Sequence, residues 1–167
     1  MMDVIDFEVL ARSCAPHVHV QTMAAIVRTE SGYNPFAIGV VDGALVRQPR
    51  TRDEAVATAK ALLAGGWNFS LGLSQVNLHQ LPRYGLSLVT AFEPCRNLRA
   101  GSAILAECFD RARATPHGRD EQSAVRDSLS CYYSGNFLTG YHAGYVNRVE
   151  VNAAMPIGVV RLTPLLR

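Results

Sequence analysis

Glu30 is the residue of this sequence that is best placed to act as an acid. It shares one helical stripe, at positions i, i+3, i+4 and i+7, with three apolar residues, Met23, Ile26 and Val27. The apolar stripe of an amphipathic helix faces the protein core. A carboxyl group there loses contact with water, which raises its pKa and lets it hold a proton near neutral pH for transfer to a leaving group. The alternative is a solvated glutamate in the last turn of its helix.

Other catalytic or metal-binding arrangements fail on their spacing. Ser74 lies in the word Gly-Leu-Ser-Gln-Val, which lacks the second glycine of a nucleophile elbow. His17 and His19 are two residues apart and point away from each other on a helix. Structural zinc sites use paired C-x-x-C spacing, which does not occur among the four cysteines, Cys14, Cys95, Cys108 and Cys131. We therefore expect neither a bound metal ion nor a cofactor.

The helix that carries Glu30 must end directly after it. Gly32 favours a left-handed cap, and Pro35 blocks continuation. Apolar spacing and capping residues predict further helices over 7–14, 51–64, 98–112, 120–135 and 145–149.

One β element is expected near Glu30. Apolar residues at 40–41 and 44–46 flank Asp42-Gly43, which predicts a hairpin over 38–48. Residues 67–77 are expected to be irregular. The predicted fold is mainly α with this small β-hairpin insertion, as a single domain over 1–154 followed by a C-terminal tail over 155–167.

The bulk composition indicates a globular protein. The chain has 167 residues, of which 49% are hydrophobic, and a net charge of +2 that is too small to indicate nucleic acid binding. It contains no run of 18 apolar residues that would span a membrane, and no secretory signal is visible in its first 30 residues. The four cysteines nevertheless favour an oxidising compartment, and four buried thiols in a cytosolic protein are the alternative.

Four separated segments resemble the lytic transglycosylases of the lysozyme superfamily (the SLT domain, glycoside hydrolase family 23). Residues 30–35 read Glu-Ser-Gly-Tyr-Asn-Pro and resemble the catalytic E-S-x-x-N-P word of that family. Residues 72–77 resemble its G-L-M-Q-I segment, with Ser74 in place of Met, and residues 97–105 resemble its N-[IL]-x-x-G helix. Residues 131–135 stand where the family has A-Y-N-x-G. The resemblance implies a lysozyme-like helical domain with the β insertion beside an active-site cleft.

Two further sequence motifs, at 132–137 and 144–149, resemble those of the VirB-type enzymes of type IV secretion and conjugation systems. That resemblance implies a periplasmic enzyme that opens the cell wall locally for an envelope-spanning machine. Its partners would be peptidoglycan glycan strands and components of the secretion system.

The resemblance also implies a mechanism with one carboxyl group. Glu30 would protonate the glycosidic oxygen between N-acetylmuramic acid and N-acetylglucosamine, and would then accept the proton of the muramoyl 6-hydroxyl as a 1,6-anhydro sugar forms. The resemblance implies five substrate-binding residues, Ser31, Gln75, Asn77, Tyr132 and Tyr133. We expect the Tyr132 hydroxyl to orient Glu30 or a substrate group, whereas Tyr133 replaces the usual Asn.

Four of these residues also have a structural alternative. Ser31 could cap its own helix, Gln75 and Asn77 could cap a loop, and Tyr132 could pack in the core. Tyr33 and Tyr145 could stack on sugars or pack in the core.

Three other functions remain open. A goose-type lysozyme would hydrolyse the same bond with water and would need a second carboxylate, for which Asp42, Asp53 and Glu54 are candidates. A non-catalytic glycan-binding module of a secretion apparatus would keep the cleft without the chemistry. A cytosolic helical adaptor would keep four free thiols.

Four cysteines allow three pairings. A helix from about Asn97 would hold Cys95 and Cys108 too far apart for a bridge, which leaves two pairings open. Related transglycosylases resemble this chain in a first-helix Cys and a Pro-Cys before the long helix. That resemblance favours Cys14–Cys95, and with it Cys108–Cys131.

Overall fold

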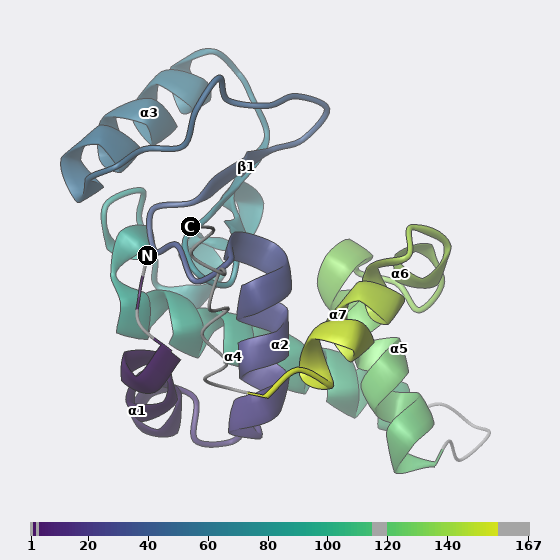
Figure 1. The fold of residues 1–167 in the computed structure, drawn as a ribbon. Helices are drawn as coiled ribbons and strands as arrows, with labels where there is room; N and C mark the ends of the chain where they lie inside the picture. The colour runs from purple at the N-terminus through teal and green to yellow at the C-terminus, as the bar shows by residue number, and fades with distance from the viewer. Residues whose placement is uncertain (1, 3, 115–119, 157–167) are drawn as a thin grey trace, which may run out of the picture.

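A computed structural model describes residues 2, 4–114 and 120–156 of the chain. Within them, helices form a body around α2, and a small sheet with one helix lies beside it (Figure 1). The helices of the body are α1 (Val4–Cys14), α2 (Val20–Ser31), α4 (Pro94–Arg113), α5 (Glu121–Ser134), α6 (Thr139–His142) and α7 (Tyr145–Ala153). The second part contains β1 (Ile38–Val40), α3 (Arg52–Ala64), β2 (Phe69–Leu71) and β3 (Val76–Asn77), followed by the short 3-10 helices η1 (Leu78–Gln80), η2 (Pro82–Tyr84) and η3 (Thr90–Phe92).

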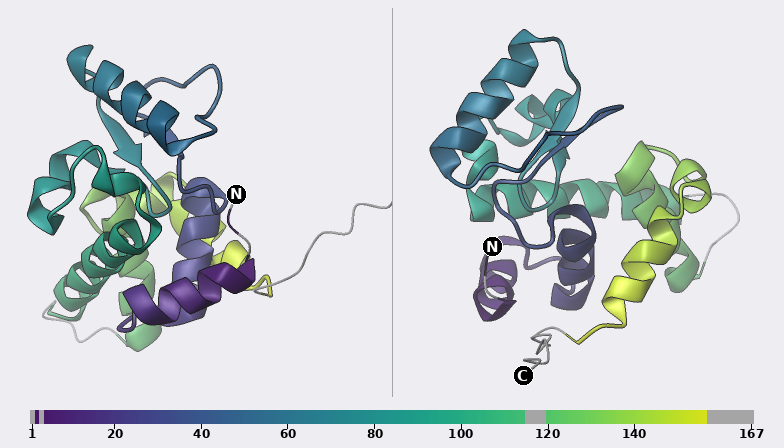
Figure 2. Two further views of the ribbon diagram at one scale, coloured as in Figure 1. Left: turned by 90° about the vertical axis from the view of Figure 1, so that its left-hand side faces the viewer. Right: turned by 45° about the horizontal axis from the view of Figure 1, so that its top comes forward.

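Two apolar cores hold these parts together. One surrounds the buried face of α2, where Met23, Ile26 and Val27 are fully buried. The other lies between the sheet, α3 and α4 and includes Phe69 and Leu71. The long helix α4 runs past both parts (Figure 2) and contributes residues to both cores. The mainly α fold with a small β insertion is therefore confirmed.

The predicted hairpin over 38–48 is wrong in its pairing. β1 pairs antiparallel with β2, Ile38 opposite Leu71 and Val40 opposite Phe69, and β2 pairs with β3. The second strand thus comes from the stretch that was expected to be irregular. Burial explains the choice, because Phe69 and Leu71 are completely buried whereas Val46 is fully exposed. Pairing across α3 buries more apolar surface than a local hairpin would.

Both disulfides agree with the predicted pairing. Cys14–Cys95 joins α1 to the start of α4, with Cα atoms 5.3 Å apart. Cys108–Cys131 joins α4 to α5, with Cα atoms 5.7 Å apart. As expected, Cys95 and Cys108 belong to one helix and cannot pair with each other.

The helix α7 ends at Ala153, and most of the predicted tail, 157–167, lies outside the described residues. That division of the chain stays a prediction. Among the described helices, none is both long and apolar enough to cross a membrane.

Candidate active site

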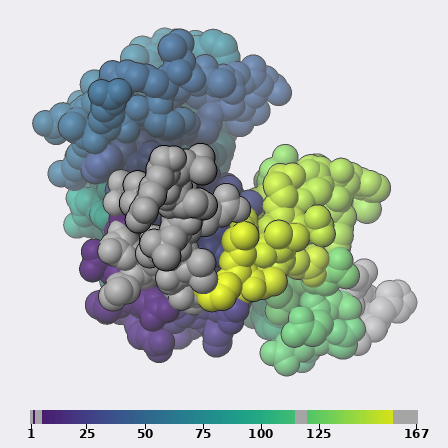
Figure 3. All heavy atoms as spheres, viewed as in Figure 1, coloured from purple at the N-terminus to yellow at the C-terminus, as the bar shows by residue number. Residues whose placement is uncertain are grey.

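Glu30 lines a cavity of about 660 Å³ between the sheet and α5. It occupies the last turn of α2, which ends at Gly32 in the left-handed conformation (φ 57°). The space-filling view shows the surface hollowed between the blue loop after β1 and the green lobe of α5 and α6 (Figure 3). We call this hollow the Glu30 cavity.

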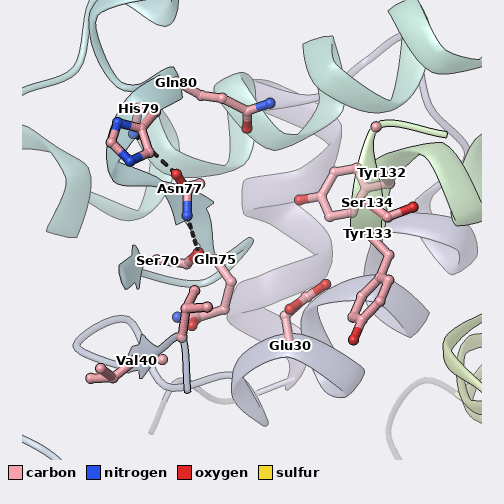
Figure 4. Close-up of a pocket in the computed structure, with 13 residues that line it drawn as sticks. Glu30, Val40, Ser70, Gln75, Asn77, His79, Gln80, Tyr132, Tyr133 and Ser134 are labelled. Atoms are coloured by element: carbon pink, nitrogen blue, oxygen red, sulfur yellow. Dashed lines mark hydrogen bonds between the residues drawn. The ribbon is translucent and has the colours of Figure 1, made fainter. Parts of the chain in front are cut away.

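The Glu30 cavity has two unlike walls (Figure 4). One wall is polar and comes from the sheet and η1, and the other comes from the end of α5. The polar wall includes Ser70, Gln75, Asn77, His79 and Gln80, and the α5 wall includes Tyr132, Tyr133 and Ser134.

Gln75 and Asn77 are held in the polar wall by hydrogen bonds to other parts of the protein. Gln75 Nε2 donates to the carbonyls of Ala37 and Gly72, at 3.0 and 2.9 Å. Asn77 Nδ2 donates to Asn68 Oδ1 at 2.9 Å and to Ser70 Oγ at 3.3 Å. Both residues therefore have the loop-fixing role that was the alternative, and both still line the cavity.

Ser31 does not line the Glu30 cavity. Its hydroxyl donates to the carbonyls of Val27 and Leu73, at 3.1 and 2.8 Å. Ser31 thereby fastens the loop before Gln75 to the last turn of α2. Its contacts are those of a positioning residue.

Tyr132 lines the cavity, but its hydroxyl does not orient Glu30. It donates to the Ser74 carbonyl at 2.6 Å instead. The residue that contacts the acid is Tyr145, whose hydroxyl donates to Glu30 Oε1 at 2.5 Å. Tyr145 begins α7, which packs against α2, and it is buried.

The sequence contained no signal for the contact between Tyr145 and Glu30, which are 115 positions apart. Tyr145 was expected either to stack on sugars or to pack in the core. The packing of α7 on α2 decides its role, and that packing is visible only in three dimensions.

The environment of Glu30 changes the pKa of its carboxyl group. Burial raises the pKa of Glu30 to about 7, while the hydrogen bond from Tyr145 and the charge of Arg148 lower it by smaller amounts. Burial, with the nearby Glu30 charge, also raises the pKa of Tyr145 well above its ordinary value, so the tyrosine keeps its proton and acts as donor. A carboxyl group with a pKa near 7 can both give and take a proton at neutral pH.

The three candidates for a second carboxylate lie elsewhere. Asp42 occupies a turn (φ 56°), and Asp53 lies on α3 beside a separate pocket. Glu54 pairs with Arg47 and accepts a hydrogen bond from the Arg50 backbone N–H. Among the described residues that line the Glu30 cavity, Glu30 is the single carboxylate.

Within the described part of the chain, no three His, Cys, Asp or Glu residues are grouped as a metal ion would need. Besides Glu30, the polar side chains that line the cavity are Tyr132, Tyr133, Gln75, Gln80, Asn77, His79, Ser70 and Ser134.

Known proteins are similar to this chain over most of its length. The family model of the transglycosylase SLT domain matches residues 8–153. The type IV secretion system protein virB1 of Brucella suis is 50% identical over 169 residues, covering 98% of this chain and 71% of the relative. The virB1 protein of Agrobacterium fabrum is 31% identical over 150 residues, covering 89% of this chain and 59% of the relative. No solved structure matches the chain. The chain thus belongs to the SLT transglycosylase family, among its VirB-type members.

Proposed function

We propose that this protein is a peptidoglycan lytic transglycosylase that uses Glu30 as its only catalytic carboxyl group. It cleaves the β-1,4 bond between N-acetylmuramic acid and N-acetylglucosamine and forms a 1,6-anhydro product. The observation that carries the proposal is the single carboxylate among the described residues that line the cavity. Hydrolysis by the two-carboxylate route requires a second such group near the first.

The first step uses the protonated form of Glu30. The carboxyl proton moves to the glycosidic oxygen as the bond from that oxygen to the muramoyl C1 breaks. Since the pKa of Glu30 is about 7, much of the protein carries this proton at neutral pH. Tyr145 then donates to the carboxylate left behind and stabilises it.

The second step returns the proton to Glu30. The carboxylate accepts the proton of the muramoyl 6-hydroxyl while the 6-oxygen bonds to C1. One C–O bond has replaced another, and no water is consumed. A nucleophile held within the substrate acts at high effective molarity, so no second carboxylate is needed to activate it.

The polar wall is proposed to bind the sugar. Both amide hydrogens of Gln75 are used within the protein, which leaves its Oε1 as an acceptor for a substrate N–H or hydroxyl. Asn77 lines the same wall, while Tyr132 and Tyr133 face it from α5. Ser31 contributes indirectly, through its hydrogen bond to the Leu73 carbonyl.

The biological setting is proposed from the relatives. Proteins named type IV secretion system protein virB1 are half identical to this chain over almost its whole length. We infer that this enzyme acts in the periplasm and opens the wall locally for a type IV secretion system. Two disulfides suit an oxidising compartment.

Mass spectrometry of digested glycan strands tests the reaction. We expect the wild type to produce strands with 1,6-anhydromuramoyl ends, and we expect no digestion by Glu30→Gln. Reducing ends would identify a goose-type lysozyme instead. Glycan binding without any product from the wild type would identify a non-catalytic module.

A further inference from the structure

Tyr133 occupies the position at which the sequence motif of lytic transglycosylases has an asparagine. It contacts Tyr145, the residue that donates a hydrogen bond to Glu30. Its ring stacks on the ring of Tyr145, with centroids 4.8 Å apart and planes at 26°. Tyr133 is 47% exposed and lines the Glu30 cavity, whereas Tyr145 is buried. Figure 4 shows Tyr133 beside Glu30 at the foot of the α5 wall. The three residues form one chain of contacts, Tyr133 to Tyr145 to Glu30.

We propose that Tyr133 is a positioning residue that holds Tyr145 in its hydrogen bond with Glu30. The inference deepens the function proposed above and rests on it. Tyr133 acts through the face of its ring. Its hydroxyl makes no hydrogen bond within the described part of the chain. The contact of Tyr133 with Tyr145 is therefore the stack of the two rings.

Tyr145 needs such support because of where it lies. It is the first residue of α7 and follows Gly144, whose φ of 70° marks a sharp change of chain direction. No side chain caps this end of the helix. The Tyr145 hydroxyl must nevertheless stay 2.5 Å from Glu30 Oε1. An offset stack between two aromatic rings restricts the orientation of both.

The groups that face Glu30 set its pKa, and a change in that pKa is the sign by which an effect of Tyr133 on Tyr145 can be detected. Tyr145 and Arg148 approach from α7 and lower the pKa of Glu30, against the larger effect of burial, which raises it. Tyr132 approaches from α5 and keeps its proton, because burial and the nearby Glu30 raise its pKa. On the sheet side, Gln75 is neutral and His79 lines the same cavity. Any loss of the hydrogen bond from Tyr145 must therefore move the pKa of Glu30 upward.

The test is the pH dependence of kcat/KM on soluble glycan strands of N-acetylglucosamine and N-acetylmuramic acid. The alkaline limb of this profile is the range in which kcat/KM falls as Glu30 loses its proton. Tyr145→Phe should move that limb to higher pH by roughly half a pH unit or more, because it removes the hydrogen bond from Tyr145 to Glu30. Tyr133→Ala should move the limb in the same direction and lower kcat by about 3- to 10-fold. The double variant should have the limb of Tyr145→Phe alone, since both changes remove one interaction.

Two further variants separate positioning from other roles. Tyr133→Phe keeps the stacking ring and should restore the wild-type limb. Trp67→Ala removes an aromatic ring of similar exposure, 49%, that does not line the cavity, and the limb should stay in place. Circular dichroism confirms that each variant is folded, and Tyr133→Leu replaces Tyr133→Ala if the latter does not fold.

A raised KM with an unmoved limb in Tyr133→Ala would overturn the proposal, because Tyr133 would then contact only the sugar. Additive shifts in the double variant would also overturn it. Glu30→Gln is assayed in parallel. If that variant still digests glycan, the proposed function is wrong, and if it is inactive while the limb is unmoved, only the role of Tyr133 is wrong.

Discussion

Asn97 on α4 holds the loop that carries Ser74. The Ser74 backbone N–H donates to Asn97 Oδ1 at 2.7 Å, and Asn97 Nδ2 donates to the carbonyls of Leu71 and Ala91, at 2.8 Å each. Asn97 is 1% exposed, so these bonds form out of contact with water. One turn further along α4, a Cβ on Gly101 would lie 2.4 Å from the Ser74 Cβ. Asn97 and Gly101 thus allow the loop to lie directly on α4, with the neighbouring Gln75 in the cavity wall.

Asn97→Leu should lower the free energy of unfolding by about 3 kcal/mol or more. The change leaves one N–H and two carbonyls in the interior without this partner, at about 1–3 kcal/mol for each unsatisfied group. Chemical denaturation measures the effect. Asn147→Leu is the matched control, because Asn147 is exposed on α7 and its replacement should change the stability by no more than about 0.5 kcal/mol. Equal effects at the two positions would contradict the structural role of Asn97.

Glu30→Gln should abolish turnover and should stabilise the protein at alkaline pH. The pKa of Glu30 is raised from 4.5 to about 7 by folding, so its protonated form is favoured in the folded state. That contribution is complete below the unfolded value and is lost as pH rises through about 7. At pH 8 the ionised carboxylate therefore costs roughly 3 kcal/mol relative to a neutral side chain. Denaturation of both proteins at pH 4 and pH 8 measures the difference, and a variant that is less stable than the wild type at pH 8 would make Glu30 a structural residue.

Arg148 should set the pH range of activity together with Tyr145. Its charge lowers the pKa of Glu30, so Arg148→Met should move the alkaline limb of kcat/KM upward. Because Arg148 is exposed, salt should reduce its effect. The limb of the wild type should therefore approach that of the variant between 0.05 and about 0.5 M salt. A limb that moves downward in the variant would show that Arg148 does not act on Glu30 through its charge.

The position of Glu30 on the buried face of α2 was predictable from sequence because its signal is local. Met23, Ile26 and Val27 on the stripe of Glu30 are buried as their spacing predicts, and Gly32 ends the helix. The hydrogen-bond partner of Glu30 was not predictable. Tyr145 reaches Glu30 only because α7 packs on α2, and nothing in the spacing around Tyr145 distinguishes a donor from a core aromatic.

The error in the hairpin has the same origin. The chain does turn here, but at Val41-Asp42, and Asp42 has a positive φ of 56°. Local turn residues, however, do not decide which strand pairs with β1. The completely buried Phe69 and Leu71 decide it, from beyond α3. A sequence pattern that extends over about ten residues does not report how much apolar surface becomes buried when a strand pairs with another about thirty residues away.

The two disulfides should fail in different ways when removed. Cys14–Cys95 closes a separation of 81 residues and Cys108–Cys131 one of 23, which in a chain-entropy model contribute about 4.5 and about 3.4 kcal/mol. Replacing Cys14 and Cys95 by Ser should therefore lower the Tm more. Replacing Cys108 and Cys131 should lower kcat while the protein is still folded, because Cys131 directly precedes Tyr132 and Tyr133 in the cavity wall. Melting curves and glycan digestion of both double variants check this, and equal activity in the two would contradict it.

The three acids considered as second carboxylates should be dispensable for cleavage. We expect Asp42→Asn, Asp53→Asn and Glu54→Gln, singly and combined, to keep kcat within about twofold of the wild type, because none of these side chains lines the Glu30 cavity. The Glu54 change removes its pairing with Arg47 on the exposed surface, which should have little effect on the Tm. Rates of glycan digestion at pH 6 are compared with those of Glu30→Gln, which should be inactive. A loss of kcat by 100-fold or more in any of the three would identify that residue as a general base. The protein would then be assigned as a hydrolase and not as a transglycosylase.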